Sequence, residues 1–382
     1  MNSFGGFAAE RNERGERVDL PFVLLVVVMC GLGFVALYTG SMAYAARAFN
    51  DPLYFVRRQS VNLGIGFVAM MAFAFVRLDF LRAQLPKLVL LTLVVSFLPF
   101  VPGIGITKNG ASRWIAVGPA TFQPSELMKL VLVLFLANIF DKKHDRLHEP
   151  EVSIYPAAFM TFVMISVIAL QDDFSTAILV IAIALTLFFV AGVKILWFLK
   201  FCALTIPFVA LMILTVEYRL KRVLAFLFPE LDPFDSSYQV NAALAALSDG
   251  EFWGRGLGNG LRKVSSIPEV QSDFIFAVWG EEMGFFGVLV YFALLVMLSA
   301  RGYLIAIRCR DRFRSYVAFG CVSALLLQSI MNVGVVARVF PATGIPLPFF
   351  SSGGSSLLIT LCLCGLIVNV SRWGETGEME NV

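Results

Sequence analysis

The sequence predicts an all-α polytopic membrane protein with ten transmembrane helices. Of its 382 residues, 58% are hydrophobic and only 15% are charged, whereas an average soluble domain carries about 25% charge. The apolar residues also form blocks of roughly twenty, the length that a helix needs to cross a ~30 Å hydrocarbon core. These blocks are apolar on all sides, whereas the strands of a membrane barrel alternate apolar and polar residues.

Each predicted span has a local justification. The first follows a polar stretch that does not resemble a cleavable signal, and it is long enough to stay in the membrane. The fourth begins at Pro124, which suits the first turn of a helix. The fifth and sixth are separated only by polar Gln171-Asp-Asp173, which suits a tight hairpin at a membrane surface. The ten predicted spans are Leu20–Tyr38, Ser60–Val76, Leu85–Val101, Pro124–Phe140, Ile154–Leu170, Phe174–Gly192, Ile195–Val216, Phe274–Ser299, Ser315–Val336 and Ser355–Val370.

Ten spans place both termini on the same side of the membrane. That side, with the span ends next to it, holds seventeen Lys and Arg residues, against twelve on the other side. Six of the twelve belong to one long loop and carry little weight, so the positive-inside rule predicts cytoplasmic termini. We therefore expect cytoplasmic tails at 1–18 and 373–382, one membrane domain over 19–372, and extracytoplasmic loops at 39–59, 102–123, 217–273 and 337–354.

The large loop at 217–273, between the seventh and eighth spans, is the longest polar segment. Near its end, glycines at 254, 256, 258 and 260 allow an irregular backbone whose N–H groups can bind phosphate oxygens. Asp273 directly precedes the eighth span, where it could cap the helix or act as a base at the lipid–water boundary. The basic residues of the loop could bind an anionic headgroup or simply form a solvated face: Arg219, Lys221, Arg222, Arg255, Arg262 and Lys263.

A second polar group lies before and inside the fourth span. Arg113-Trp114 offers a cation beside an interfacial aromatic, and Gln123 directly precedes Pro124. Glu126 and Lys129 are three residues apart, so they share a helix face. Ionisable groups inside a membrane cost a few kcal/mol unless they are paired or hydrated. The pair is therefore either a structural bridge or part of an outward-facing polar cavity.

Two further segments combine polar and helix-breaking residues. The hairpin Gln171-Asp172-Asp173, with Ser175 and Thr176, is either a solvated turn that caps the next helix or part of a cavity wall. The stretch from Asn332 through Arg338 to Ser356 contains prolines and glycines that prevent a continuous helix. Irregular backbone near membrane depth must be buried in protein or line a hydrated cavity, so we expect a re-entrant element here.

All four groups fall on the extracytoplasmic half of the predicted topology. A carrier should show polar groups at the midplane and often two related halves, and neither is evident. This distribution favours an outward-facing cavity that acts on a membrane-held substrate.

These motifs resemble the SEDS family, the FtsW, RodA and SpoVE group of peptidoglycan glycosyltransferases. The resemblance covers nearly the whole chain. It rests on the ten spans together with Asn109-Gly-Ala-x-Arg113-Trp114, Gln123-Pro-Ser-Glu126-x-x-Lys129, Gly256-Leu-Gly-x-Gly260-x-x-Lys263, Pro268-Glu269-x-x-x-Asp273-Phe-Ile-Phe276, Glu281-Glu282-x-Gly284 and Gly344-Ile-Pro-Leu-Pro348 … Ser352-Gly-Gly-Ser355.

The resemblance implies polymerisation of lipid II, the undecaprenyl-pyrophosphate disaccharide-pentapeptide, on the outer face of the cytoplasmic membrane. It also implies a class B penicillin-binding protein and other divisome or elongasome proteins as partners. By position, Asp273 matches the essential loop aspartate and the candidate general base. The implied substrate-binding residues are Arg113, Glu126, Lys129, Lys263, Asp173, Gln123 and Ser352.

The chain departs from the family pattern at three places. The hairpin reads Gln171-Asp-Asp-Phe-Ser-Thr176 and lacks the family's turn proline and glycine, although Asp173 is kept. The family's Ser-Tyr-Gly-Gly reads Ser351-Ser-Gly-Gly354, and Arg338 replaces a small neutral residue. Local motifs favour the division-type FtsW slightly over the elongation-type RodA.

No organic cofactor is expected, and the sequence contains no metal-ligand spacing. The chemistry of a pyrophosphate leaving group nevertheless suggests a divalent cation such as Mg²⁺ or Mn²⁺. Two other classes of function remain open, of which the first would use the same cavity. A lipid II flippase would transport without making polymer, and a non-catalytic scaffold would tolerate every change in the cavity.

Overall fold

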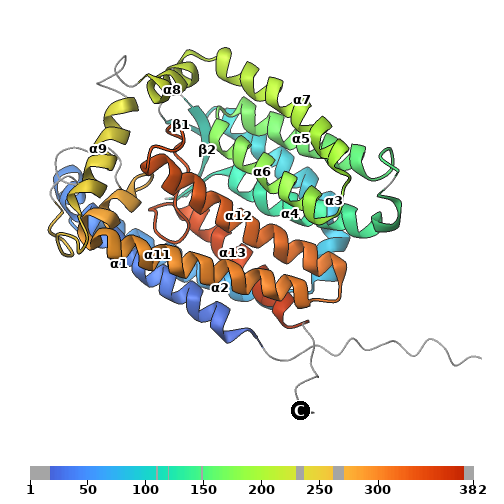
Figure 1. Ribbon diagram of the computed structural model, residues 1–382, viewed down its shortest axis with the longest axis horizontal. Helices are drawn as coiled ribbons and strands as arrows, with labels where there is room; N and C mark the ends of the chain where they lie inside the picture. The colour runs from blue at the N-terminus through green and yellow to red at the C-terminus, as the bar shows by residue number, and fades with distance from the viewer. Residues whose placement is uncertain are drawn as a thin grey trace, which may run out of the picture.

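The computed structural model is a bundle of helices with one small sheet (Figure 1). It describes residues 18–108, 111–118, 120–147, 149–228, 236–260 and 271–373. The helices are α1 (Leu20–Phe49), α2 (Tyr54–Phe75), α3 (Leu78–Phe97), α4 (Pro124–Lys142), α5 (Ile154–Leu170), α6 (Phe174–Val190), α7 (Ile195–Leu214), α8 (Glu217–Leu227), α9 (Ser236–Asp249), α11 (Ile275–Arg308), α12 (Arg312–Val336) and α13 (Gly354–Ser371). Short 3-10 turns cover Leu98–Phe100 and His144–Arg146.

Each of the ten predicted spans coincides with one long helix, from α1 to α7 and from α11 to α13. Within the described residues, six helices are long and apolar enough to cross a membrane, and α5 and α6 are shorter apolar helices. The chain is therefore a mainly α-helical membrane protein with several spanning helices. The count of ten crossings stays a prediction.

Several helices extend beyond the apolar segments that predicted them. α1 continues to Phe49 instead of Tyr38, and α11 continues to Arg308 instead of Ser299. α1 stops only where Asn50 adopts a left-handed conformation with φ of 53°. Helix ends depend on capping residues and backbone breakers rather than on the limits of the apolar run, which explains the difference.

The helices differ strongly in how deeply they are buried. The most apolar windows of α13 and α12 are 83% and 67% buried, whereas that of α7 is only 17% buried. α12 packs against α4, α6, α11 and α13, and α13 also packs against α2. Figure 1 shows α12 and α13 in the middle of the bundle and α7 along its edge. α7 therefore presents most of its apolar surface outward.

A three-stranded antiparallel sheet lies between α3 and α4, in the order β1-β2-β3. Its strands are β1 (Gly105–Lys108), β2 (Ala111–Val117) and β3 (Ala120–Phe122). The sequence predicted only an extracytoplasmic loop at 102–123, so the sheet is an addition. Lys108 pairs with Ala111, and the Asn109-Gly110 between them is a strong hairpin signal.

The segment 217–273 is also more ordered than the predicted loop, because it contains α8 and α9. Figure 1 shows α8, α9 and the sheet toward one end of the bundle. The two ends of the described chain meet elsewhere, where the backbone N–H of Asp19 donates to Ser371 Oγ at 3.2 Å. The polar elements thus gather away from the chain ends.

Candidate functional site

The Pro/Gly-rich segment, residues 337–353, links the polar groups that the sequence analysis singled out. Its prolines and glycines leave carbonyl groups without helical partners, and buried side chains from other elements supply the missing donors. Asn332 Nδ2 donates to Ile345 O at 2.7 Å, and Gln328 Nε2 donates to Pro346 O at 2.8 Å. Buried carbonyls require such partners. The predicted irregular element is therefore confirmed, as a segment held inside the protein by side chains of α12.

Asp273 lies at the start of α11, beside this segment. The N-cap of α11 is Phe274 rather than Asp273. A Cβ built on Gly344 would lie only 3.2 Å from Asp273 Oδ2, so the carboxylate is next to that glycine. Asn332 Nδ2 also donates to the backbone carbonyl of Asp273 at 2.9 Å. Asp273 is half-buried and Gly344 is exposed, which leaves the carboxylate at an accessible edge of the protein.

The backbone of Ser352 is held next to the residues that precede Asp273. Its N–H donates to Gln271 O at 2.9 Å, and the neighbouring Ser351 hydroxyl donates to Ser272 O. Residues 271–273 are thus fixed to residues 351–352 by paired contacts. These contacts orient the chain on the approach to Asp273.

Glu126 and Lys129 form a buried ion pair on α4. Lys129 Nζ lies 2.7 Å from Glu126 Oε2, and the two side chains are only 2% and 3% exposed. The ammonium also donates to Gln328 Oε1 at 2.7 Å, and Gln328 in turn holds Pro346 as described above. The pair therefore supports the Pro/Gly-rich segment through Gln328, a geometry that agrees with the structural-bridge interpretation.

Asp173 is a buried carboxylate that collects donors from three elements. Gln123 Nε2 and Ser125 Oγ donate to its Oδ2 at 2.6 and 2.7 Å, and its Oδ1 caps α6 by accepting from the Thr176 N–H at 3.4 Å. Arg113 Nη1 on β2 lies 3.8 Å from the same carboxylate. The hairpin therefore caps a helix and also supports the wall of a cavity. It is not a fully solvated turn, because Gln171 and Asp173 are buried.

That cavity has a volume of about 210 Å³ and lies among the sheet, the 171–175 hairpin, α8 and residues 341–343. Arg113, Arg219 and Arg222 line it together with Asp172. Arg219 Nη2 lies 2.5 Å from Asp172 Oδ1, and Arg222 Nη1 donates to Ala342 O at 3.0 Å. Neither Glu126 nor Lys129 is among its lining residues.

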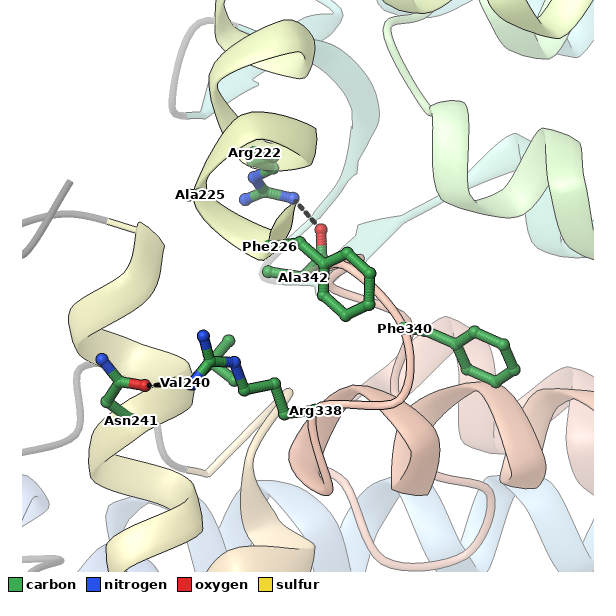
Figure 2. Close-up of a pocket in the computed structure, with 8 residues that line it drawn as sticks. All are labelled: Arg222, Ala225, Phe226, Val240, Asn241, Arg338, Phe340 and Ala342. Carbon is green, nitrogen blue, oxygen red and sulfur yellow. Dashed lines mark hydrogen bonds between the residues drawn. The ribbon is translucent and has the colours of Figure 1, made fainter. Parts of the chain in front are cut away.

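Arg338, where the chain departs from the family pattern, contacts α9 instead of the large cavity. Figure 2 shows its guanidinium directed to Asn241, whose Oδ1 it reaches at 3.3 Å, while Arg222 of α8 reaches the Ala342 carbonyl. Its backbone has φ of 56°, an uncommon value for a residue with a side chain. The two arginines connect α8 and α9 to the Pro/Gly-rich segment.

The glycine run in the large loop packs against an interruption in α11. Gly284 has φ of 65° and breaks the helix, and the N–H groups of Phe285 and Phe286 donate to Glu251 O and Phe252 O. Before Gly284, the backbone N–H groups of Arg255 and Gly256 donate to the backbone carbonyl oxygens of Glu281 and Glu282, two buried residues. This docking fixes the described part of the loop close to α11.

Some predicted site residues cannot be placed. Lys263, Arg262, Pro268 and Glu269, together with Asn109, lie outside the described residues. Lys221 is exposed and pairs with Glu217 at 2.8 Å, while Arg255 lies 3.7 Å from Asp249. Of the four basic loop residues that the structure describes, Arg219 and Arg222 line the large cavity, and Lys221 and Arg255 do not.

Sequence reasoning missed Gln328, which connects Lys129 to the Pro/Gly-rich segment. The sequence did contain a signal for Gln328, because a polar residue inside an apolar span costs free energy and is usually functional. Within the part of the chain that the structure describes, no group of three or more His, Cys, Asp or Glu could hold a metal ion.

Fold and site together define a multi-pass membrane protein with buried polar groups and a cavity among its loops. Residues 20–375 match the model of the FtsW/RodA/SpoVE family, described as cell cycle proteins. The chain belongs to this family.

Full-length relatives and solved structures agree with that assignment. A probable peptidoglycan glycosyltransferase FtsW of Geobacter sp. (strain M18) is 38% identical over 94% of this chain and 98% of its own length. Stage V sporulation protein E of Bacillus subtilis is 34% identical over 94% and 98%. Thermus thermophilus RodA has a TM-score of 0.69 at 28% identity over 94% and 98%, and a chain of a peptidoglycan synthase complex has 0.73 at 32% identity over 93% and 98%.

Proposed function

We propose that this chain, a peptidoglycan glycosyltransferase of the FtsW/RodA/SpoVE family, polymerises lipid II into glycan strands with Asp273 as its general base. The observation that carries the proposal is the position of Asp273. Its carboxylate lies beside exposed Gly344, and contacts to Asn332, Gln271 and Ser351 fix the surrounding backbone. A base must be held in place and yet remain accessible to the hydroxyl that it deprotonates.

The proposed reaction needs one carboxylate instead of the acid–base pair of a glycosidase. Asp273 accepts the proton of the acceptor GlcNAc 4-hydroxyl while that oxygen attacks C1 of the donor MurNAc with inversion. The bond from C1 to the phosphate oxygen breaks, and its electron pair leaves with undecaprenyl pyrophosphate. General-base assistance of this kind contributes about 10²–10⁴-fold to the rate.

The remaining predicted residues receive two kinds of role. We assign Arg113 to the developing pyrophosphate charge, because its guanidinium lines the cavity beside Asp172. Lys129, Glu126 and Gln123 act as positioning residues, since their contacts reach the substrate side only through Gln328 and Asp173. Lys263 and Ser352 are assigned to substrate binding on their sequence positions.

The cellular setting of the proposal follows from topology and relatives. Both termini are cytoplasmic and the reaction centre is extracytoplasmic, consistent with the gathering of polar elements away from the chain ends. A solved relative belongs to a peptidoglycan synthase complex, which supports a class B penicillin-binding protein as partner. The FtsW-named relatives at 35–38% identity favour a role in cell division.

The test is glycan polymerisation from purified lipid II by the full chain with its penicillin-binding partner. Wild type should make polymer, and Asp273→Asn should make none although it stays folded and bound to the partner. Full polymer from Asp273→Asn would refute the assignment of the base. Transport of lipid II without any polymer from wild type would favour a flippase, and partner binding alone would favour a scaffold.

A further inference from the structure

Four aromatic side chains, Tyr44, Phe49, Tyr54 and Phe55, form a cluster where α1 turns into α2. The rings of Phe49 and Tyr54 are stacked, with centroids 4.1 Å apart and an interplanar angle of 7°. Phe55 is buried and meets both of them edge-on at 5.7 and 5.2 Å, and Tyr44 lies 6.1 Å from Phe55. Tyr44 and Phe49 remain 41% and 46% exposed. This α1–α2 cluster therefore presents aromatic surface on a packed base.

The turn that carries the cluster is fixed by its own contacts. α1 ends where Asn50 adopts a left-handed conformation. Asp51 then accepts a hydrogen bond from the backbone N–H of Leu53 at 3.1 Å and pairs with Arg57 at 2.7 Å. Rigid aromatic side chains lose little conformational entropy when a ligand binds. The cluster is thus preorganised to bind a ligand with a flat apolar face.

In the predicted topology the cluster stands outside the hydrocarbon core. The first predicted span ends at Tyr38, and Phe49, the last residue of α1, lies roughly 16 Å further along the same helix. The headgroup region of one leaflet is only about 5–8 Å thick. Aromatic residues within that region are common membrane anchors. An exposed aromatic patch beyond it instead indicates a binding surface.

α2 connects the cluster to the candidate base. Gln59, about one helical turn after Phe55, is buried, and its Nε2 donates to Ser351 O at 3.3 Å. The Ser351 hydroxyl in turn donates to Ser272 O, directly before Asp273 in the chain. The cluster therefore lies near the candidate base, on the α2 side of the segment that contains Ser351.

The charges around the cluster favour an acidic ligand. Residues 41–60 contain three arginines, Arg47, Arg57 and Arg58, and a single acidic residue, Asp51. All three arginines are exposed, and the four groups together carry two positive charges. The C–H groups of a sugar ring form apolar faces that pack on aromatic rings, whose faces carry partial negative charge. A glycan strand with attached acidic peptides matches both the rings and the arginines.

We propose that the α1–α2 cluster is a binding platform for the glycan product, in which sugar rings stack on Tyr44, Phe49 and Tyr54. Arg47 and Arg58 pair with carboxylates of the attached peptides. The inference rests on the proposed function and extends it from the reacting atoms to the strand that has already been made. A strand bound here stays close to Asp273 between successive transfers. Its release is therefore delayed, and longer strands result.

The first test measures direct binding, so it does not depend on polymerisation. The full chain in nanodiscs of zwitterionic lipid is titrated with soluble glycan strands that carry peptides and no lipid. Tyr44→Ala should weaken binding about fivefold, because it removes one contact between a ring and a sugar. The matched control is Tyr38→Ala, since both tyrosines belong to α1 and are 41% exposed. Equal losses of affinity in the two variants would refute the platform.

A second position separates ring stacking from effects on folding. Phe49→Ala should weaken binding as Tyr44→Ala does, whereas Phe49→Trp keeps an aromatic face and should bind within about twofold of wild type. Melting temperatures near that of wild type would show that the variants are folded. Asp273→Asn should bind the strands like wild type, which separates this inference from the assignment of the base.

A neutral chito-oligosaccharide, which has sugar rings but no peptides, tests the arginines. Arg58→Gln should weaken binding of the peptide-bearing strands about threefold, as expected for an exposed ion pair, and should leave binding of the neutral oligosaccharide unchanged. Phe49→Ala should weaken binding of both ligands. An equal loss for both ligands in Arg58→Gln would refute the contacts with carboxylates.

Strand length is a readout that a purely structural role would not change. Weaker binding mostly reflects faster dissociation, so Phe49→Ala should make strands at most about one third as long as those of wild type at equal consumption of lipid II. Unchanged length together with unchanged binding would overturn the inference. Absence of polymer from wild type would count against the proposed function, while the binding test would still decide on the platform.

Two other occupants of the cluster would give different results. If membrane lipid covers the cluster, lipids with brominated acyl chains would quench the additional tryptophan emission of Phe49→Trp. If a protein partner covers it, Phe49→Ala would lose the penicillin-binding partner and keep its affinity for glycan. Either result would overturn the inference. We expect emission that changes when glycan is added and does not respond to the brominated lipids.

Discussion

Single buried charges determine much of the behaviour expected of this protein. Lys129 is almost fully buried, yet Glu126 and Gln328 each lie 2.7 Å from its ammonium. A buried ion pair adds little net stability compared with an apolar pair of similar volume, but removal of one partner leaves an uncompensated charge. We therefore expect a single substitution in this pair to destabilise the folded protein much more than a double substitution does.

Glu126→Gln alone should destabilise the folded protein by about 3–5 kcal/mol, whereas Glu126→Gln with Lys129→Met should recover most of that loss. Thermal unfolding of wild type, Glu126→Gln, Lys129→Met and the double variant in one detergent gives the coupling energy. Additive losses in the double variant would contradict the pairing.

The contact between Gly344 and Asp273 leads to a second prediction at this scale. Gly344 has φ of 72°, and a new Cβ would lie 3.2 Å from Asp273 Oδ2. Gly344→Ala should therefore lower polymerisation rates at least tenfold, because it strains the segment by about 1–3 kcal/mol and displaces the candidate base. Gly118→Ala is a matched control, since Gly118 has φ of 59° with no atom near its Cβ position. Equal polymerisation rates in the two variants would show that the contact between Gly344 and Asp273 does not matter for catalysis.

At the scale of elements, the sequence predicted the long helices well, because apolar blocks of membrane length have few alternative structures. It also predicted the irregular backbone of residues 337–353 from the prolines and glycines there, while the re-entrant position of this segment in the membrane stays a prediction. It did not predict the sheet at 105–122 or the helices α8 and α9, because short polar elements obtain their stability from neighbours that composition does not reveal. The contact between Gln328 and Lys129 likewise depends on the packing of α12 against α4.

The docking of the loop onto α11 gives a prediction for these elements. A Cβ on Gly254 would lie 2.2 Å from Glu282 O, whereas a Cβ on Gly258 would meet nothing within 4 Å. Both glycines have similar positive φ values of 79° and 83°. Gly254→Ala and Gly258→Ala therefore share the backbone strain and differ only in the steric clash. Faster hydrogen exchange of residues 250–256 in Gly254→Ala, compared with Gly258→Ala, is the expected result, and equal exchange would refute the docking.

At the scale of the whole molecule, the arrangement of polar groups bears on the orientation of the protein in the membrane. The described chain ends meet through Asp19 and Ser371, and Arg301 reinforces the contact at 3.0 Å from Asp19. The arginines after α11 belong to the side that the positive-inside rule assigns to the cytoplasm. The same topology prediction assigns the cavity, the sheet and α8 to the other side. A reaction on a lipid-linked sugar outside the cell requires this polarity.

This polarity can be measured by labelling introduced thiols in whole cells. Lys221→Cys on exposed α8 and Arg310→Cys between α11 and α12 are matched, since both replace an exposed basic residue. The background carries Ser or Ala in place of the six native cysteines, of which only Cys202 is not buried. A membrane-impermeant maleimide should label the cysteine at 221 in intact cells and the one at 310 only after permeabilisation. The reverse pattern would place the cavity in the cytoplasm, where it could not serve extracellular polymerisation.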